Sequence, residues 1–361
     1  MFEPVTLARE NIRNLMSYSS ARHEFGGSAD VFLDANENSF GSPTGVGLNR
    51  YPDPLQTRLK EELSQMNGIR PEQIFVGNGS DEAIDLLLRI FCEPLRDRAM
   101  IFPPTYGMYK VCADINGVEV YEVELTNDFQ LDLAGIDEQY SAATKVIFIC
   151  SPNNPTGNSI RISDVLGIAA RLNSIVVVDE AYIHFSEKDS LIGEIDRYPN
   201  LVILQTFSKA WGLAGARVGL AFANSRIIGL LNRVKPPYNV NEISQRLIVE
   251  ALTKRELVET WVDRIKTQRA ELVQILNTFN FVRTVFPSDA NFLLVQVDAP
   301  DEIYKFLLAR GIVVRNRNTL RRCEGCLRIT IGTPDENKRL VDSLSQFQMK
   351  KSARRSAKQN I

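Results

Sequence analysis

A lysine occupies the most chemically distinctive stretch of the chain, TFSKAWGLAGAR at residues 206–217. An apolar run precedes this stretch and delivers Lys209 into a short loop that contains glycine. Partial desolvation lowers the pKa of a lysine, and only the neutral amine attacks a carbonyl to form a Schiff base. Thr206, Ser208 and Arg217 carry groups that can bind a phosphate. Taken alone, the Ser-Lys pair is equally consistent with a solvated surface loop.

A buried carboxylate would complete this chemistry. A carbonyl cofactor with a pyridine ring acts as an electron sink only while its ring nitrogen is protonated, which requires a carboxylate beside it. Asp179 ends the most apolar run of the chain, where an unpaired carboxylate is costly and implies a cationic partner. Asn154 and Tyr182 can donate to a ring oxygen, and Tyr106 offers a flat partner for the ring.

A glycine turn precedes a helix at GNGSDE, residues 77–82. The apolar-faced run up to residue 89 predicts a helix with Ser80 or Asp81 as its N-cap. Free N–H groups and the positive end of the helix dipole make such a turn an anion site that includes Gly79. The same pattern is also that of an ordinary capped helix.

The candidate residues follow strands that alternate with amphipathic helices. We expect strands at 75–76, 99–103, 118–123, 145–150, 175–179 and 201–204, and helices at 55–66, 83–89 and 163–172. Continuous β-branched runs of this kind predict a parallel sheet covered on both faces, in the α/β class. Tyr106, Asn154, Asp179 and Lys209 each follow the carboxyl end of a strand, where open α/β sheets bind ligands.

The chain divides into two expected domains and a tail. Residues 31–265 are predicted to form a large α/β domain that binds the cofactor, beginning with a Gly- and Pro-rich arm. Residues 1–30, with a helix at 7–15, and 266–348 are predicted to form a small α+β domain. A helical period spans 241–276, followed by strands at 291–297, 312–315 and 327–331 and helices at 300–310 and 334–347. Basic residues 349–361 contain no acid and are expected to be disordered.

Composition narrows the class of partner. The 361 residues carry a net charge of -2 and a pI near 5.9, which favours neither nucleic acid nor a membrane surface. The first residues lack a leader-like pattern, so we expect a cytoplasmic protein that acts on small molecules. The five cysteines are expected to be reduced, and we interpret Cys323 and Cys326 as incidental thiols rather than metal ligands because no second pair accompanies them. We predict no metal.

Several motifs in this order resemble the fold-type I pyridoxal-phosphate aminotransferases, and among them the histidinol-phosphate aminotransferases. They are DANEN at 34–38, RYPDP at 50–54, GNGSDE at 77–82, PPTYGMY at 103–109, SPNNPTG at 151–157, DEAY at 179–182, SKAWGLAGARVG at 208–219 and CLRITIGT at 326–333. The resemblance implies a large domain with a mostly parallel seven-stranded sheet and a smaller α+β domain. The sequence departs from the common pattern at Gln205, where arginine is frequent, and at Trp211.

The resemblance also implies roles for single residues. Lys209, Asp179 and Tyr182 would be catalytic. The protein would form a homodimer with shared active sites, in which Tyr51 of one subunit contacts the cofactor of the other. Within one subunit, pyridoxal 5'-phosphate would contact Gly79, Ser80, Asp81, Tyr106, Asn154, Asp179, Tyr182, Thr206, Ser208, Lys209 and Arg217. Substrate would be bound by Tyr18, Asn36, Arg315 and Arg328. Packing for Tyr18 and Tyr51, and a strand cap or ion pair for Arg328, are the ordinary alternatives.

The implied reaction is transamination between histidinol phosphate and 2-oxoglutarate, which yields glutamate. An aromatic amino-acid aminotransferase or a decarboxylase of a phosphorylated amino acid would keep the same cofactor residues. A third alternative is a sensing module of the same fold, against which the intact Lys209 and Asp179 and the absence of a basic face argue.

Overall fold

A seven-stranded sheet forms the centre of the computed structural model, which describes residues 3–16, 29–45 and 47–359, with side chains as far as residue 350. The strand order is β1-β7-β6-β5-β4-β2-β3. Its members are β1 Ile74–Asn78, β2 Arg98–Ile101, β3 Glu119–Glu122, β4 Thr144–Cys150, β5 Ile175–Asp179, β6 Leu201–Thr206 and β7 Val218–Ala223. Every neighbouring pair is parallel except those that involve β7, which runs antiparallel to β1 and β6. The prediction of a mostly parallel sheet of seven strands is confirmed.

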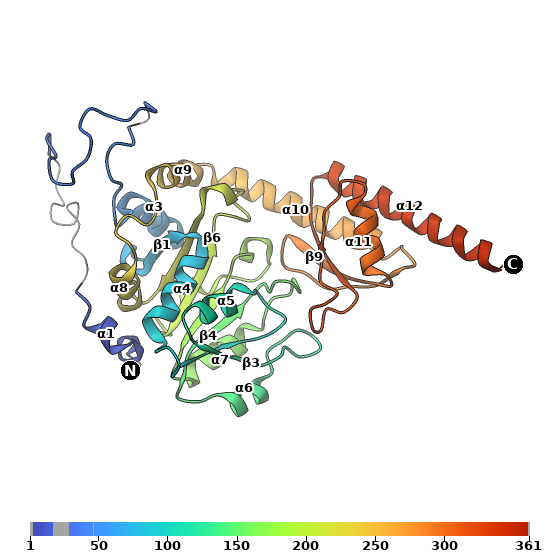
Figure 1. Cartoon of the computed structure of the whole chain (residues 1–361), viewed down its shortest axis with the longest axis horizontal. Helices are drawn as coiled ribbons and strands as arrows, with labels where there is room; N and C mark the ends of the chain where they lie inside the picture. Colours follow the sequence, from blue (N-terminus) through green and yellow to red (C-terminus); the bar gives the residue numbers. More distant parts are fainter. Residues whose placement is uncertain (1–2, 17–28, 46, 360–361) are drawn as a thin grey trace.

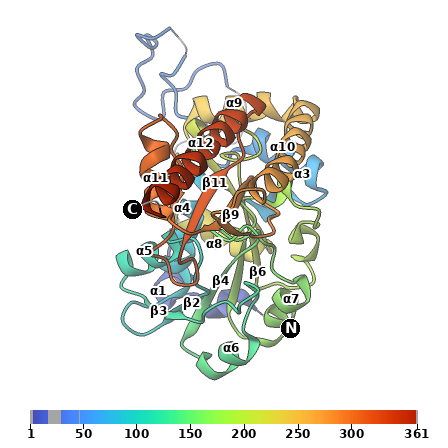
Figure 2. The same ribbon diagram turned by 90° about the vertical axis from the view of Figure 1, so that its right-hand side faces the viewer.

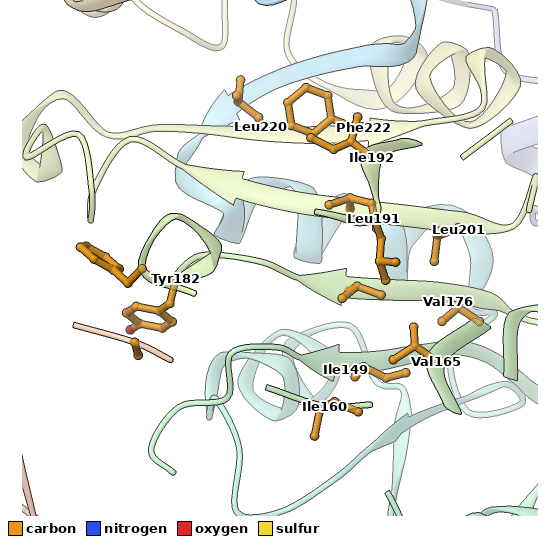
Figure 3. Close-up of a cluster of buried hydrophobic side chains, with 14 of the residues drawn as sticks. Ile149, Ile160, Val165, Val176, Tyr182, Leu191, Ile192, Leu201, Leu220 and Phe222 are labelled. Atoms are coloured by element: carbon orange, nitrogen blue, oxygen red, sulfur yellow. The ribbon is translucent and has the colours of Figure 1, made fainter. Parts of the chain in front are cut away.

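Helices cover both faces of this sheet (Figures 1 and 2). Strand residues alternate between the faces, so Phe148 packs on one side and Ile147 and Ile149 on the other. The first face is covered by α4 Gly79–Phe91, α5 Met108–Ile115 and α8 Ser225–Val234. The second is covered by α3 Thr57–Asn67, α6 Leu133–Gln139, α7 Ile162–Arg171 and α9 Glu242–Leu252, and by short 3-10 turns at Ile183–Phe185 and Leu191–Glu194. Figure 3 shows part of the core on this second face.

A second, antiparallel sheet has the order β10-β11-β9-β8. Its strands are β8 Val282–Val285, β9 Phe292–Val297, β10 Arg315–Asn316 and β11 Cys326–Thr330. It packs with α11 Pro300–Leu308, α12 Pro334–Gln359 and the end of α10 Arg255–Leu276. Figure 1 shows α10 running from the first lobe to the second. Val258 and Val262 of α10 belong to the core of the large sheet, while Leu272 and Leu276 belong to the core of the second.

The described part of residues 29–56 contains no helix or strand and extends away from the body of the molecule (Figure 1). Arg50 forms an ion pair of 2.6 Å with Glu37, whose other oxygen accepts from the backbone N–H of Tyr51. Prolines and glycines prevent regular structure here, as the sequence predicts. This segment, residues 29–56, is called the arm below.

The N-terminal residues pack against the large sheet, whereas the sequence predicted that they belong to the small domain. In place of one helix at 7–15, the chain forms the 3-10 helix Pro4–Leu7 and α1 Glu10–Arg13. Leu7 and Ile12 pack in the core that α4 and α8 share with the large sheet, and Arg9 pairs with Glu93. Grouping residues 1–30 with the small domain is therefore wrong for this segment, because its apolar side chains are buried on the large sheet.

Other elements also differ from the prediction: helices α5, α6 and α8 were not expected, and the strand expected at 312–315 is the shorter β10. Strands β7 and β8 were not anticipated, and the helical period at 241–276 is broken at Thr253 and Lys254. The last helix continues past Phe347 through the basic segment to Gln359, where we expected disorder. That segment has neither proline nor glycine, and Lys, Arg, Ala and Gln all have high helix propensity. The domain boundary near residue 265 stays a prediction. None of the described helices is both long and apolar enough to cross a membrane.

Candidate functional site

A cavity of about 540 Å³ opens at the carboxyl ends of β4, β5 and β6, where Cys150, Asp179 and Thr206 line it. The start of α4 and the segment before α5 form its sides. Residues of the second lobe, among them Arg315 and Arg328, close it from across the sheet edge. The cavity thus lies where the sequence predicts the ligand site, at the carboxyl ends of the parallel strands.

Lys209 lies three residues after the end of β6 and lines the cavity. Its Nζ is 5.7 Å from the ring centroid of Tyr182. Burial lowers the pKa of Lys209, and so do the positive charges of Arg328 and Arg217, while Asp179 opposes the change. A lowered pKa increases the fraction of neutral, nucleophilic amine. The sequence-based expectation of a desolvated lysine agrees with this environment.

Asp179 lies on the floor of the cavity with its side chain almost completely buried. Tyr109 of α5 donates a hydrogen bond of 2.8 Å to its Oδ2, and the backbone N–H of Ala181 donates one of 3.1 Å to its Oδ1. Burial raises the pKa of Asp179 to about 6, against these two bonds, which lower it. Among the described residues no lysine, arginine or histidine forms an ion pair with it. Its environment therefore favours a cation brought in by a ligand.

The start of α4 and the loop before β7 form a cradle of closely packed backbone. The N–H of Gly79, with φ of +70°, donates to the carbonyl of Arg217 at 2.9 Å. A Cβ placed on Gly219 would lie 2.1 Å from the backbone nitrogen of Ser80, so only glycine fits there. Arg217 itself has a φ of +54° and faces Asp81 at 3.6 Å. The N–H groups of the first helical turn lack intrahelical acceptors, so the cradle suits an anion such as a phosphate.

The helix cap differs from the prediction. Asn78, rather than Ser80 or Asp81, occupies the N-cap position, and its side chain caps no N–H of the helix. Glu82 instead reaches back to the N–H of Asn78 at 2.5 Å, which fixes the turn. Ser80 and Asp81 therefore lie inside the first turn, and both line the cavity.

The hydroxyls near the lysine are partly engaged within the loop. Thr206 Oγ1 donates to the carbonyl of Val218 at 3.4 Å and accepts from the N–H of Ser208 at 3.1 Å. This contact joins the end of β6 to the start of β7, since Thr206 pairs with Gly219 in the sheet. Both hydroxyl residues line the cavity.

Aromatic and amide side chains surround the centre of the cavity. Tyr106 donates a hydrogen bond of 3.1 Å to Asp81 and lies edge-on to Tyr109. Tyr182, which Figure 3 labels, is buried and packs edge-on against Phe292 of the second lobe. Burial raises the pKa of Tyr182, so its phenol stays protonated and able to donate.

Asn154 links the two lobes, because its Oδ1 accepts a hydrogen bond of 2.5 Å from Arg328 Nη1. Arg315 lies directly opposite Arg328 in the β10–β11 pair. Burial lowers the pKa of Arg328, and the neighbouring arginines add to this effect. The predicted neighbourhood of Arg315 and Arg328 on adjacent strands is confirmed by this register.

The cavity brings together most of the predicted site residues, while two others lie elsewhere. Tyr51 stacks on Tyr238 with ring centroids 4.4 Å apart, and neither it nor Asn36 of the arm lines the cavity. Tyr18 lies outside the described residues. The residues that do line it are Gly79, Ser80, Asp81, Tyr106, Asn154, Asp179, Tyr182, Thr206, Ser208, Lys209, Arg217, Arg315 and Arg328.

Sequence reasoning assigned no role to two residues of this site. Tyr109 lies in the PPTYGMY motif, in the first turn of α5, three positions after Tyr106. Arg317 lines the cavity and follows Arg315 by two positions, the spacing of one face of a strand. Each signal is present in the sequence, but its partner is identified only by the fold.

Comparison with known proteins identifies the family of this chain. The family model described as aminotransferase class I and II matches residues 29–344. A histidinol-phosphate aminotransferase of Parabacteroides distasonis is 50% identical over 95% of this chain and 98% of its own length. The crystal structure of a histidinol-phosphate aminotransferase from Clostridium acetobutylicum superposes with a TM-score of 0.78 at 25% identity, covering 84% of this chain and 92% of that one. The structure of the Sinorhizobium meliloti histidinol-phosphate aminotransferase in complex with pyridoxal-5'-phosphate has a TM-score of 0.74 at 22% identity, over 94% and 96% of the two chains, and shows the same fold. The chain belongs to the class I and II aminotransferases.

Proposed function

We propose that this protein binds pyridoxal 5'-phosphate and catalyses transamination between L-histidinol phosphate and 2-oxoglutarate, giving imidazole acetol phosphate and L-glutamate. The observation that carries the proposal is the presence of Lys209 and Asp179 in the same cavity. The lysine has a lowered pKa, and the carboxylate is buried without an ion pair among the described residues. An aldehyde with a basic ring nitrogen complements both groups.

The residues of the cavity fit this cofactor. Asp179 would face the ring nitrogen, Asn154 and Tyr182 the ring oxygen, and Tyr106 the ring face. The cradle at Gly79, Ser80, Thr206, Ser208 and Arg217 would hold the phosphate, because only a glycine at 219 allows the helix and the loop to approach so closely. Bound there, pyridoxal phosphate supplies an electron sink for the negative charge that develops at the substrate Cα.

The protein's own groups would position the substrate and move the proton. Lys209 Nζ would take the proton from the substrate Cα as a neutral amine, acting as general base, and would then give it to the cofactor's carbonyl carbon, acting as general acid. Arg328 would bind the α-carboxylate of glutamate, and its hydrogen bond to Asn154 holds the guanidinium in the cavity. Arg315, on the neighbouring strand, would bind the phosphate of histidinol phosphate.

The substrate assignment is supported by the relatives that share about half of their residues with this chain. They are histidinol-phosphate aminotransferases from Parabacteroides distasonis and Christiangramia forsetii, the second 48% identical over 95% of the chain. An aromatic amino-acid aminotransferase would need cations for the carboxylates of its substrates but not for a phosphate dianion.

We also propose a homodimer with shared active sites. Tyr51 and Asn36 lie on the arm, away from the cavity of their own chain, and the arm exposes Phe40 and Leu33 to solvent. An extended segment without a core of its own is suited to packing on a second copy. A cytoplasmic location is part of the proposal and rests on five free cysteines, all buried.

Spectra of the half-reaction test the substrate. The holoenzyme is mixed separately with histidinol phosphate, phenylalanine, tyrosine and glutamate, and conversion of the bound cofactor to its amine form is followed by absorbance. We expect fast conversion with histidinol phosphate and glutamate and much slower conversion with the two aromatic amino acids. A preference for phenylalanine over histidinol phosphate in kcat/KM would replace the proposal with the aromatic aminotransferase.

A further inference from the structure

Three arginines share one face of the second sheet. Arg315 pairs with Arg328 across β10 and β11, and directly paired residues of an antiparallel ladder point to the same face. The ladder continues one step beyond β10, because the N–H of Arg317 donates to the carbonyl of Cys326 at 2.9 Å. Residues two apart on a strand also share a face, so Arg317 lies beside the other two. All three line the cavity.

The protein itself provides few hydrogen-bond acceptors for the guanidinium of Arg317. Its Nε is buried and has no hydrogen-bond acceptor among the described residues. Within the same part of the chain, none of the three arginines forms an ion pair with a carboxylate, and Arg328 donates to a neutral amide oxygen. Burial and the charge of Arg315 both lower the pKa of Arg317. Grouping like charges in this way is unfavourable unless an anion binds between them.

The number of arginines matches a phosphate better than a carboxylate. A phosphate monoester carries a charge of about -1.5 to -2 at pH 7 and three acceptor oxygens, whereas a carboxylate carries one charge and two oxygens. One bidentate arginine satisfies a carboxylate, so two arginines satisfy the two carboxylates of glutamate and a third guanidinium adds little. For a phosphate dianion it adds a charge-assisted hydrogen bond.

We propose that Arg317 is a specificity-determining residue, which binds the phosphate of the substrate together with Arg315 and so selects a phosphate monoester over a carboxylate in this cavity. The proposal rests on the function proposed above and names a residue to which neither the motifs nor the family resemblance gave a role. Arg317 contributes little to the glutamate half-reaction, which Arg328 supports.

Arg317→Gln tests the proposal, with histidinol phosphate, histidinol and glutamate as three donors for the holoenzyme. Histidinol differs from the first donor only by the phosphate. We expect the variant to lose roughly 10- to 100-fold in kcat/KM for histidinol phosphate and less than about 3-fold for histidinol and glutamate, since a hydrogen bond to a charged group is removed only in the first case. Cofactor content, read from absorbance, should be unchanged.

A charge-matched control is available four positions away. Arg321 is largely exposed, pairs with Glu124 and does not line the cavity, so Arg321→Gln removes the same charge without the contact. It should leave the preference for the phosphate intact. Arg317→Lys keeps the charge but not the fork of donors and should give an intermediate loss, which also covers the case of a Gln variant that folds poorly.

The pH dependence gives a second readout. The second pKa of a phosphate monoester is near 6, so KM of the wild-type enzyme for histidinol phosphate should rise below that pH, and the rise should be flatter in Arg317→Gln. Equal losses on all three donors would mean a structural role and overturn the inference. If the wild type and Arg317→Gln prefer histidinol phosphate over histidinol to the same degree, the inference about Arg317 is overturned while the proposed function stands. A wild type without preference for the phosphate would overturn the proposed function and this inference together.

Discussion

The phenol of Tyr109 donates a hydrogen bond of 2.8 Å to Oδ2 of Asp179, and both side chains are buried. Tyr109 is held in place by stacking on Phe148 of β4, with ring centroids 4.9 Å apart. The bond lowers the pKa of Asp179 against the larger effect of burial, which raises it to about 6. Tyr109 therefore helps to keep the carboxylate ionised and correctly oriented in a dry site.

Replacing Tyr109 with phenylalanine tests this role. The ring and its stacking are kept, but Asp179 loses a donor, so its pKa should rise further above 6. We expect cofactor binding to weaken by about 1–3 kcal/mol and the acidic limb of the kcat profile to move to higher pH. Equilibrium dialysis and pH-rate profiles measure the two effects. Tyr106→Phe is the matched control, because that hydroxyl bonds to Asp81 instead, and it should not move the acidic limb.

Lys209→Ala should abolish transamination, because the variant lacks the amine that binds the cofactor carbonyl and moves the proton. In the wild type, borohydride should attach the cofactor to a peptide that contains Lys209. Lys60 and Lys235 provide an internal comparison: their pKa values are lowered to about 8, yet neither lines the cavity. Mass-spectrometric detection of the cofactor on either of them would contradict the assignment.

Hybrid dimers test whether Tyr51 acts across an interface. We expect Tyr51→Ala and Lys209→Ala to be impaired separately and to recover part of the activity when mixed, because one of the two sites in the hybrid then has both residues intact. Subunit exchange is verified with differently tagged chains before activity is compared. If exchange occurs without recovery, Tyr51 does not contribute to the site of a partner.

The buried carboxyl of Glu180 should make the protein less stable as the pH rises. Its side chain is buried and accepts hydrogen bonds from Ser190, Gln205 and the N–H of Leu191. Burial raises its pKa to about 7 from an ordinary 4.5. At this group the folded state thus binds more protons than the unfolded state between these values, so the contribution of Glu180 to stability is highest below pH 4.5 and declines up to pH 7. The difference amounts to about 3 kcal/mol for a shift of this size.

Glu180→Gln removes this titration, so the decline in Tm between pH 5 and 8 should become shallower, and the variant should be the more stable protein at the alkaline end. Thermal melts across this range provide the measurement. A Gln substitution at the exposed Glu187, which pairs with Lys266, is the control and should leave the decline in place. Parallel curves for wild type and Glu180→Gln would show that the buried carboxyl does not govern the pH dependence.

The parts of the fold that could be predicted from sequence are those with a strong local signal. Strands such as Ile175–Asp179 are β-branched and uniformly buried, and the polar residue at their carboxyl ends marks the site. Strand β7, VGLAFA, contains glycine and alanine, which have low β-propensity, so its pairing with β1 and β6 was not evident.

The residues missed in the site have partners that are distant in sequence. Tyr109 and Asp179 are separated by 70 positions, and no local pattern relates them. Arg317 depends on the register of β10 against β11, which cannot be derived for a two-residue strand. The motifs and the family resemblance therefore identified most of the residues that line the cavity, while the contacts among them required the tertiary structure.

Helix α10 should make the two lobes unfold together on heating. Its first turns complete the core of the large sheet through Val258 and Val262, and its last turns complete the other core through Leu272 and Leu276. Melting either lobe would strip one end of this continuous helix of its apolar cover. Calorimetry should accordingly record a single cooperative transition rather than two, and the smaller lobe should not persist as an independent folding unit.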